Sequence, residues 1–396
     1  MPTLRENFNC SNKSYEKQLA KKASPGMKAL PSTSSNYLII DEGERNVLAM
    51  KLNLKEFRNE VQKTAKRSMG ECYIGGDTFN FEMAVEGANE GIALDLTPLK
   101  SSNGKEFGAV EINKGKISIK VSLPKFIRPD NIMPFSMSDA IMLEVMKNDI
   151  EPALKLALKG KIDDRLDVLS ATAKSIECNI TKRVAGDSTC SHVLNLINRS
   201  FHEGTNIVYQ RASTKCKYDK ENETVIVRKR NYYVLKSYDK SLQQRKAGNQ
   251  HIENGLLRIE VIMLNRTIDK LFGTSPTIEN VLTEQGLMRI IKEYKRIFIE
   301  DVINGHIRPC LRYVTDTLFK TLTEKDNQLK AIALHKEIIM DVAILHKALV
   351  KWYKAKGYSK ERAKRNADTY ICRCRIKYGF PTNVIDTMRE FKKLCN

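Results

Sequence analysis

The strongest candidates for chemistry are five polar residues in three strand-like segments. Apolar and polar residues alternate through residues 174–181 (KSIECNIT) and 256–264 (LLRIEVIML). Successive side chains of a strand point to opposite faces. One face would therefore carry Glu177, Arg258 and Glu260 and, from residues 234–238 (VLKSY), also Lys236 and Tyr238. For any one charged residue a merely solvated face is the simpler interpretation, but the combination predicts a reactive site.

Two carboxylates, a tyrosine and lysines form a set that suits phosphodiester chemistry. Carboxylates from two strands can hold a divalent metal ion through hard oxygen ligands, and the ion would neutralise charge that develops on a phosphate. A tyrosine oxygen can attack phosphorus and form a covalent intermediate. Lysines beside the phosphate would add electrostatic stabilisation.

The tripeptide YDK occurs twice, at residues 218–220 and 238–240. The first copy lies in KCKYDKENETV, where the polar run DKENE predicts a hairpin turn with Tyr218 at its tip. The second copy ends an apolar strand and is followed by Arg258 and Glu260. We expect those two strands to pair, so that only Tyr238 has a carboxylate partner.

The charge of the chain points to an anionic partner. The 396 residues carry a net charge of +20, which attracts polyanions such as nucleic acid or an anionic membrane. No run of 18 apolar residues occurs, and the first residues, MPTLRENFNC, lack the apolar core of a signal peptide. We therefore expect a cytoplasmic protein that binds nucleic acid and no membrane.

The cysteines and histidines give no metal-binding motif. The nine cysteines are scattered without a CxxC pair, and the six histidines form neither HxH nor HExxH. This pattern predicts free thiols in a reducing compartment.

The chain divides into three parts by composition. Residues 1–36 are predicted to be a basic, disordered tail, because they are rich in Ser, Asn and Lys and have little apolar periodicity. Residues 37–274 are predicted to be an α+β catalytic domain that includes a β-rich N-terminal part, with a helix at 54–67 and strands near 37–41, 72–85, 91–96, 107–112 and 116–123. A helical segment at 136–158 would be capped by Ser136 or Ser138, and a helix at 192–201 would be followed by a strand at 205–210.

The last part, residues 275–396, is predicted to be a basic helical domain. Ser275 is expected to cap its first helix, with Pro276 at the first helical position. Apolar residues then recur at helical spacing from Leu287 to Phe298, and further helical segments are predicted at 311–324, 327–355, 358–378 and 382–394.

Several of these segments together resemble a known family. The succession SIECNIT, NIVYQ, LKSYDKSLQQRK and LLRIEVIML resembles the catalytic domain of rolling-circle replication initiators, both plasmid Rep proteins of the YDK/RxE type and filamentous-phage gene II replication proteins. Residues 121–140 are similar to a phage-type segment that precedes the first catalytic strand. The resemblance covers roughly residues 120 to 270. It implies an antiparallel nickase-like sheet with helices on one face.

The resemblance also assigns roles to individual residues. Tyr238 would be the nucleophile that nicks one DNA strand at the origin and stays joined to the 5′ phosphate, and Lys240 would lie near that phosphate. Glu260 would be catalytic or metal-binding, with Arg258 beside it, and Glu177 would be a second ligand of Mg²⁺ or Mn²⁺. The sequence departs from the family in lacking an HxH pair and a second acidic residue in IECNIT. His192 or His202 are the alternatives for completing the metal site.

Basic residues in two regions are candidates for DNA contacts. Residues 351–396 hold 13 Lys/Arg against 4 Asp/Glu, with four tyrosines among them. Phosphate neutralisation supplies most non-specific affinity for DNA. A basic bundle that only stabilises the catalytic domain or mediates dimerisation is the alternative. The predicted DNA-binding residues are Lys236, Arg245, Lys246, Lys351, Lys354, Lys356, Lys360, Arg362, Lys364, Arg365, Arg373 and Arg375.

Two functions from different classes follow. The first is an enzyme that nicks and rejoins DNA to start replication of a plasmid or phage-like element, with double-stranded origin DNA, single-stranded DNA and a host helicase as partners, and a homodimer as an option. The second is a non-enzymatic initiator or other DNA-binding protein that binds the origin and recruits host factors. A tyrosine recombinase is disfavoured because no HxxR box occurs.

Overall fold

The structure is a computed structural model of the 396-residue chain. It describes residues 73–84, 94–162, 167–184, 187–202, 214–229, 231–249, 252, 254–325, 327–378, 380–381 and 384–395. All of them belong to one compact unit, residues 56–396. The predicted tail 1–36, the helix at 54–67 and the strands at 37–41 and 205–210 lie outside the described residues.

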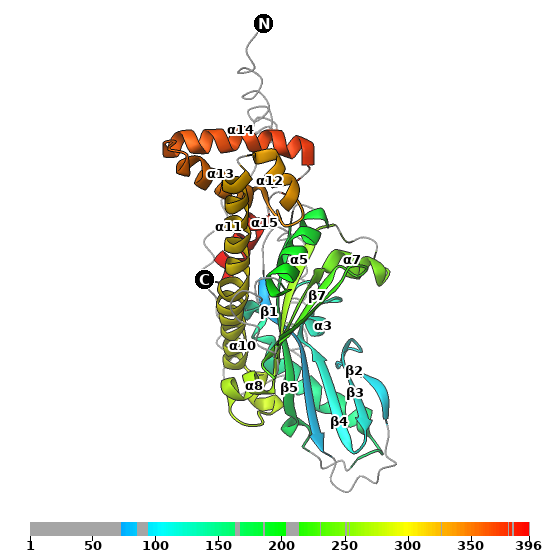
Figure 1. Cartoon of the computed structure of the whole chain (residues 1–396). Coiled ribbons are helices and arrows are strands. Elements are labelled where there is room, and N and C mark those ends of the chain that lie inside the picture. The colour runs from blue at the N-terminus through cyan, green and yellow to red at the C-terminus, as the bar shows by residue number, and fades with distance from the viewer. Residues whose placement is uncertain are drawn as a thin grey trace, which may run out of the picture. The chain divides into compact units, whose positions relative to one another are not determined.

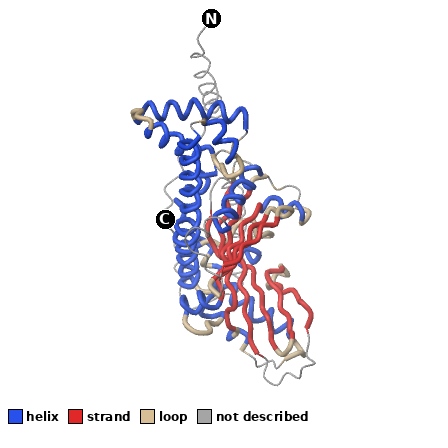
Figure 2. Tube along the Cα trace, viewed as in Figure 1, coloured by secondary structure: helices blue, strands red, loops and turns tan. Residues whose placement is uncertain are grey.

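Among the described residues, nine strands form one antiparallel sheet in the order β2-β3-β4-β1-β5-β9-β8-β7-β6. Figures 1 and 2 show this sheet beside the helices. Together with the helices it makes an α+β fold, as the sequence predicted. The strands are β1 (Tyr73–Ala84), β2 (Leu94–Lys100), β3 (Glu106–Asn113), β4 (Lys116–Ser122), β5 (Thr172–Arg183), β6 (Thr214–Asp219), β7 (Thr224–Lys229), β8 (Tyr233–Asp239) and β9 (Leu256–Leu264).

Alternation of side chains gives the central part of the sheet one apolar and one polar face. On β9, Leu257, Ile259, Val261 and Met263 are fully buried. They lie beneath α5 (Asp187–His202) and α10 (Glu284–Arg296), and the Tyr294 hydroxyl of α10 donates to the Ile259 carbonyl at 3.0 Å. Both helices contact this side of the sheet (Figure 1). The polar face of the same strands is left for the candidate site.

Short helices and loops shape the region before β5. Helix α3 (Leu123–Ile127) follows β4, and the 3₁₀ turn η1 (Met137–Asp139) precedes α4 (Met142–Leu158). Ser136 and Asp139 form a capping box at η1, which agrees with the expected start of this helical segment. The loop between α3 and η1 bridges to β1 through Gly76 and Phe135. This loop therefore lies beside the centre of the sheet. A second 3₁₀ turn, η2 (Val168–Ser170), leads into β5.

The C-terminal region is helical, as predicted. Helix α10 continues through the π-helical segment η3 (Ile297–Ile307) into α11 (Arg308–Lys325). The remaining helices are α7 (Lys240–Lys246), α8 (Asn265–Phe272), α9 (Ile278–Val281), α12 (Gln328–His335), α13 (Val342–Ala355), α14 (Lys360–Tyr378) and α15 (Val384–Cys395). The predicted segment 327–355 is thus two helices.

The predicted cap at Ser275 is wrong. Ser275 has a positive φ of 54°, and the Pro276 carbonyl accepts a hydrogen bond from Ala173 N, so this dipeptide belongs to a bridge with β5. The helix begins later, and its cap is Thr277, whose hydroxyl accepts from Asn280 N. Thr277, two residues after Ser275, offers the same capping hydroxyl, and the sequence pattern does not distinguish the two positions.

The described residues also bear on the cysteines, on membrane-spanning helices and on the predicted domain boundary. Cys178, Cys190, Cys216, Cys310 and Cys395 form no disulfide in the part of the chain that the structure describes. Within the described ranges, no helix is both long and apolar enough to cross a membrane. The predicted division at residues 274/275 stays a prediction, because both sides belong to the same compact unit.

Candidate active site

The strand register gathers the five predicted residues on the polar face. Glu260 lies opposite Lys236 of β8, and Arg258 lies opposite Tyr238. On the other side of β9, Glu260 is opposite Asn179 of β5, so that Glu177 is its diagonal neighbour. Directly opposite residues in a sheet share a face, and the three central strands therefore bring these side chains together.

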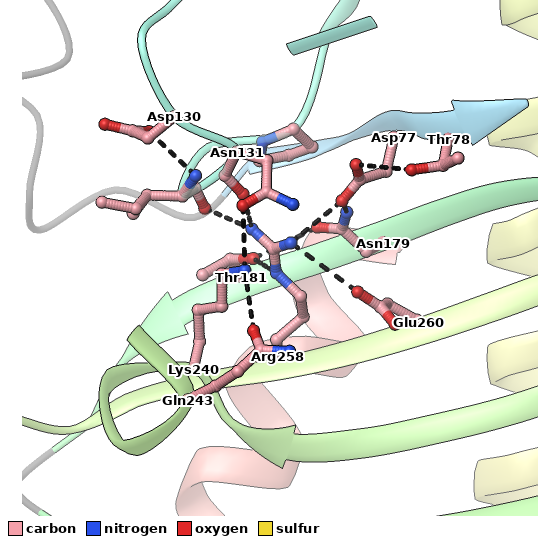
Figure 3. Close-up of polar contacts among 12 residues, drawn as sticks. Asp77, Thr78, Asp130, Asn131, Asn179, Thr181, Lys240, Gln243, Arg258 and Glu260 are labelled. Atoms are coloured by element: carbon pink, nitrogen blue, oxygen red, sulfur yellow. Dashed lines mark hydrogen bonds and ion pairs between the residues drawn. The ribbon is translucent and has the colours of Figure 1, made fainter. Parts of the chain in front are cut away.

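Arg258 is the centre of a buried polar network (Figure 3). Its side chain is fully buried and its Nη1 pairs with the Asp77 carboxylate at 2.9 Å. Nε donates to Thr181 Oγ1 at 2.7 Å, and Nη2 donates to the main-chain carbonyls of Asn131 and Ile132. A buried charge is tolerated only when it is paired and hydrogen-bonded, and here the guanidinium joins β1, β5, β9 and the loop after α3.

Tyr238 points at Glu260. Its hydroxyl donates to Glu260 Oε1 at 2.6 Å, and only 3% of the residue is exposed. Burial, and then the neighbouring negative charge of Glu260, raise the pKa of the Tyr238 phenol well above its ordinary value. The phenol is therefore protonated at neutral pH, and Glu260 is the group placed to accept its proton.

Two lysines lie beside the tyrosine. Lys236 Nζ is 4.9 Å from the Tyr238 ring centroid and 3.8 Å from Glu260 Oε2. Lys240 Nζ is 5.9 Å from the same ring and donates to Asn131 Oδ1 and Gln243 Oε1. Burial and the nearby Arg258 lower the pKa of Lys240 to about 7. This ammonium can therefore lose or give a proton near neutrality.

The pKa of Glu177 depends on the other carboxylates of this face. Burial first, and then the negative charges of Glu260 and Asp77, raise its pKa to about 7. A bound cation between Glu177 and Glu260 would relieve that repulsion. Two carboxylates with water and a substrate phosphate are a common Mg²⁺ environment. The two carboxylates therefore have the chemistry of a divalent-ion site that further oxygen ligands would have to complete.

The described residues do not by themselves form a complete metal site. Among the described residues, no group of three or more His, Cys, Asp or Glu side chains is arranged to hold a metal ion. The alternatives His192 and His202 are wrong, because both are on α5, which packs on the opposite face of the sheet. The contact of Asn198 of this helix with Cys216 of β6 shows which face it covers.

A cleft of about 490 Å³ opens beside Tyr238. Strands β6 to β8 form its floor and α7 one of its walls, and Lys217, Lys236 and Lys246 all line it. Lys246 also ties the wall to the β6–β7 turn, since its Nζ donates to Glu221 O and Asn222 Oδ1. The predicted contact residue Arg245, also on α7, bonds Asn254 instead of lining this cleft.

The two YDK copies share one feature and differ in another. In each, the aspartate caps the following turn: Asp219 Oδ1 accepts from Asn222 N, and Asp239 Oδ1 accepts from Leu242 N at the start of α7. The tyrosines face opposite sides, because Tyr218 shares a face with Ser237 while Tyr238 is opposite Thr224. Tyr218 lies in β6 before the turn, and its hydroxyl donates to Glu223 at 3.0 Å.

Asp77 and Asn131 are central to the site and were not predicted. Asp77 follows Gly75 and Gly76 at a shift in register between β1 and β5, so simple alternation does not place its side chain. It accepts from Asn179 Nδ2 at 2.9 Å as well as from Arg258. Asn131 binds Lys240 by its side chain and Arg258 by its carbonyl. The two glycines before Asp77 were the one available sequence signal.

The predicted C-terminal DNA-binding residues are spread over α13, α14 and the turn between them. Lys354, Lys356, Lys360, Arg362, Lys364 and Arg365 are exposed there, whereas Lys351 pairs with Asp316 at 2.9 Å. Lys356 lies 4.1 Å from the Trp352 ring centroid and Arg362 4.9 Å from that of Tyr358. The side chains of Arg373 and Arg375 lie outside the described residues. These six side chains therefore form an exposed basic surface.

Glu177→Gln is expected to stabilise the protein above neutral pH. A carboxyl whose folded pKa is about 7, against an ordinary 4.5, binds a proton in the folded chain that the unfolded chain releases. The free energy of unfolding therefore falls as pH rises from 4.5 to 7. Removing the charge should restore about 1–3 kcal/mol at pH 8 and nothing at pH 4.5. Chemical denaturation in EDTA at both pH values measures it.

Glu106→Gln, at an exposed strand position, is the matched control and should change neither value. Equal stability of Glu177→Gln and the unmodified protein at pH 8 would contradict the crowding of carboxylates described above.

Comparison with known proteins gives weak structural similarity. No family model matches the chain, and no curated protein matches it. Among solved structures it is similar to a rolling circle replication initiator protein from Geobacillus stearothermophilus, at 9% identity and a TM-score of 0.24, over 51% of this chain and 77% of that one. Because the similarity is weak, the function proposed below rests on the site.

Proposed function

We propose that this protein starts DNA replication by nicking one strand with Tyr238 and later rejoining it. The observation that carries the proposal is the 2.6 Å hydrogen bond from the Tyr238 hydroxyl to Glu260, on the edge of a lysine-lined cleft. A nucleophile within hydrogen-bond reach of a base, which neighbouring groups orient, is the arrangement that covalent catalysis needs.

In the proposed reaction each proton has a donor and an acceptor, and one bond forms as another breaks. Glu260 takes the phenolic proton while Tyr238 Oη attacks phosphorus, and the bond from phosphorus to the 3′ oxygen breaks. The leaving oxygen takes a proton, which Lys240 can give because its pKa is about 7. The products are a 5′-phosphotyrosine and a 3′-hydroxyl primer. Rejoining is the reverse sequence.

Arg258 is a positioning residue in this proposal. Its fully buried guanidinium donates hydrogen bonds to Asp77, Thr181 and two main-chain carbonyls. Its Nη1 also lies 3.6 Å from Glu260 Oε1. It therefore acts on DNA only through Glu260 and Asp77. Lys236 is the partly exposed cation that can meet the phosphate directly.

Mg²⁺ or Mn²⁺ is the cofactor we propose, held by Glu177 and Glu260. Such an ion would neutralise charge on the phosphate. The raised pKa of Glu177 supports this placement, since a cation would stabilise the ionised carboxylate.

The nicking assay tests the proposal directly. A supercoiled plasmid that carries the protein's own origin should become open circles, with protein on the 5′ end, when the protein and Mg²⁺ or Mn²⁺ are added. Origin binding without nicking would instead support the second function, a non-enzymatic initiator that recruits host factors. The near-complete burial of Tyr238 favours that second function. A host helicase and a homodimer are further proposed partners.

Origin binding should depend on the basic surface of α14. Replacing Lys360, Lys364 and Arg365 by Gln is expected to lower the slope of log affinity against log salt by up to about 2.7, because each phosphate contact on duplex DNA contributes about 0.9. Electrophoretic or anisotropy titrations between 50 and 200 mM salt measure the slope. The charge-matched control replaces Lys114, Lys159 and Lys161, which are exposed elsewhere. Equal slopes for both triple variants would contradict a DNA contact at α14.

A further inference from the structure

A larger cavity lies away from Tyr238, at the turn that joins β7 to β8. It has a volume of about 740 Å³, and the turn, helix α8 and the junction of α10 with η3 form its walls. A neighbouring cavity of about 500 Å³ shares Asn231 and Arg266 with it. Volumes of this size suit a nucleotide or another small ligand.

An exposed aromatic ring on a fixed support marks this site. Tyr232 is 41% exposed. Its carbonyl accepts hydrogen bonds from Leu264 N at 2.9 Å and from Thr267 Oγ1 at 2.7 Å, so the start of α8 holds its backbone. The guanidinium of Arg266 lies 5.0 Å from its ring centroid. The ring and the guanidinium that lies over it both line the cavity.

The charges around the ring leave cations free for an anion. Four cations, Lys229, Lys270, Arg266 and Arg296, line the cavity with two carboxylates. Asp301 pairs with Lys229 at 2.8 Å and Glu293 pairs with Arg296 at 2.7 Å. Arg266 forms no ion pair with any described residue, and Lys270 is 3.8 Å from Glu293. A phosphate would therefore meet Arg266 and also Lys270, whose ion pair with Glu293 is long at 3.8 Å.

We propose that this cavity binds an unstacked nucleotide of single-stranded DNA, with its base on the Tyr232–Arg266 surface and its phosphate near Arg266 and Lys270. Aromatic rings beside cations are the usual platform for single strands, because every base has a stacking face. The bases of a duplex are already stacked and cannot reach the ring. The choice of DNA over RNA rests on the proposed function.

The cavity lies at the other end of β8 from Tyr238, and the junction of α10 with η3, on the helix-covered side of the sheet, forms part of its wall. Tyr232 and Tyr238 are six residues apart on the β8 segment, which is about 20 Å at the rise of a strand. The cavity therefore contacts nucleotides some distance from any phosphate at Tyr238, and its contribution is affinity for the strand.

Binding of a fluorescent oligo(dT) that lacks origin sequence, measured by anisotropy, tests the site without relying on nicking. Tyr232→Ala should weaken binding by roughly 5- to 100-fold, the range expected for loss of one stacking contact. Tyr232→Phe keeps the ring and should bind within about twofold of the unmodified protein. Tyr313→Ala removes an equally exposed tyrosine, 44% exposed on α11, and should have no effect.

Unchanged binding by Tyr232→Ala would overturn the inference. Displacement of the oligo(dT) by dTMP at the same concentration as the oligo(dT), with the same dependence on Tyr232, would also overturn the inference. The cavity would then bind a free nucleotide. If the unmodified protein does not nick its origin, the proposed function fails. Weaker oligo(dT) binding by Tyr232→Ala, with unchanged binding by Tyr232→Phe and Tyr313→Ala, would still support this site.

Discussion

Tyr238→Phe is expected to abolish origin nicking, with a loss of at least about 1,000-fold in rate, because it removes the proposed nucleophile. The fold should persist. The substitution deletes one buried hydrogen bond, to Glu260 at 2.6 Å, and so costs about 1–2 kcal/mol of stability. Relaxation of supercoiled origin plasmid, followed on a gel with time, gives the rate.

Tyr218→Phe is the matched control, since it makes the same change in the other YDK copy. Tyr218 bonds Glu223 and faces the helix-covered side of the sheet. The expected nicking rate is that of the unmodified protein. Loss of nicking in both variants would show that the effect is structural, and loss in Tyr218→Phe alone would overturn the assignment of Tyr238.

Arg258→Met is expected to lower the free energy of unfolding by about 3–5 kcal/mol. The substitution strands the buried Asp77 carboxylate, which is 2.9 Å from the guanidinium, without its counter-charge. It also leaves the carbonyls of Asn131 and Ile132 without this donor. Chemical denaturation at pH 7 measures the loss, and circular dichroism shows whether the sheet remains folded.

Adding Asp77→Asn to Arg258→Met separates the cost of the unpaired charge from the cost of the lost hydrogen bonds. In Arg258→Met with Asp77→Asn, the stranded charge is gone, so a substantial part of the lost stability should return although the hydrogen bonds do not. If the double variant is as unstable as the sum of the two single variants, the network around Arg258 is not the coupled unit described here.

The face of the candidate site could be predicted from the sequence, because alternation is strong where a strand has one buried side. Leu257, Ile259, Val261 and Met263 set the register of β9, and Arg258 and Glu260 then had to share the other face. The same logic placed Lys236 and Tyr238 on β8. The strands β1 to β4 and the C-terminal helices also follow from local periodicity.

Residues set by tertiary structure escaped prediction. Asp77 lies at a shift in register after two glycines, and Asn131 acts from a loop partly through its main chain. The suggested ligands His192 and His202 failed because periodicity identifies a helix but not the face of the sheet that it covers. The roles of Glu177, Arg258, Glu260, Lys236, Lys240 and Tyr238 remain predictions that their positions support.

The central claim is a covalent bond between Tyr238 and a 5′ phosphate, and peptide mass spectrometry of the nicked product tests it most directly. After nuclease and trypsin digestion, cleavage following Lys236 and Lys240 releases Ser-Tyr-Asp-Lys, whereas the other copy releases Tyr-Asp-Lys between Lys217 and Lys220. The two peptides differ by one serine. The account predicts a nucleotide mass on Ser-Tyr-Asp-Lys. A nucleotide on Tyr-Asp-Lys or on any other peptide, or nicked DNA that carries no peptide, would contradict it.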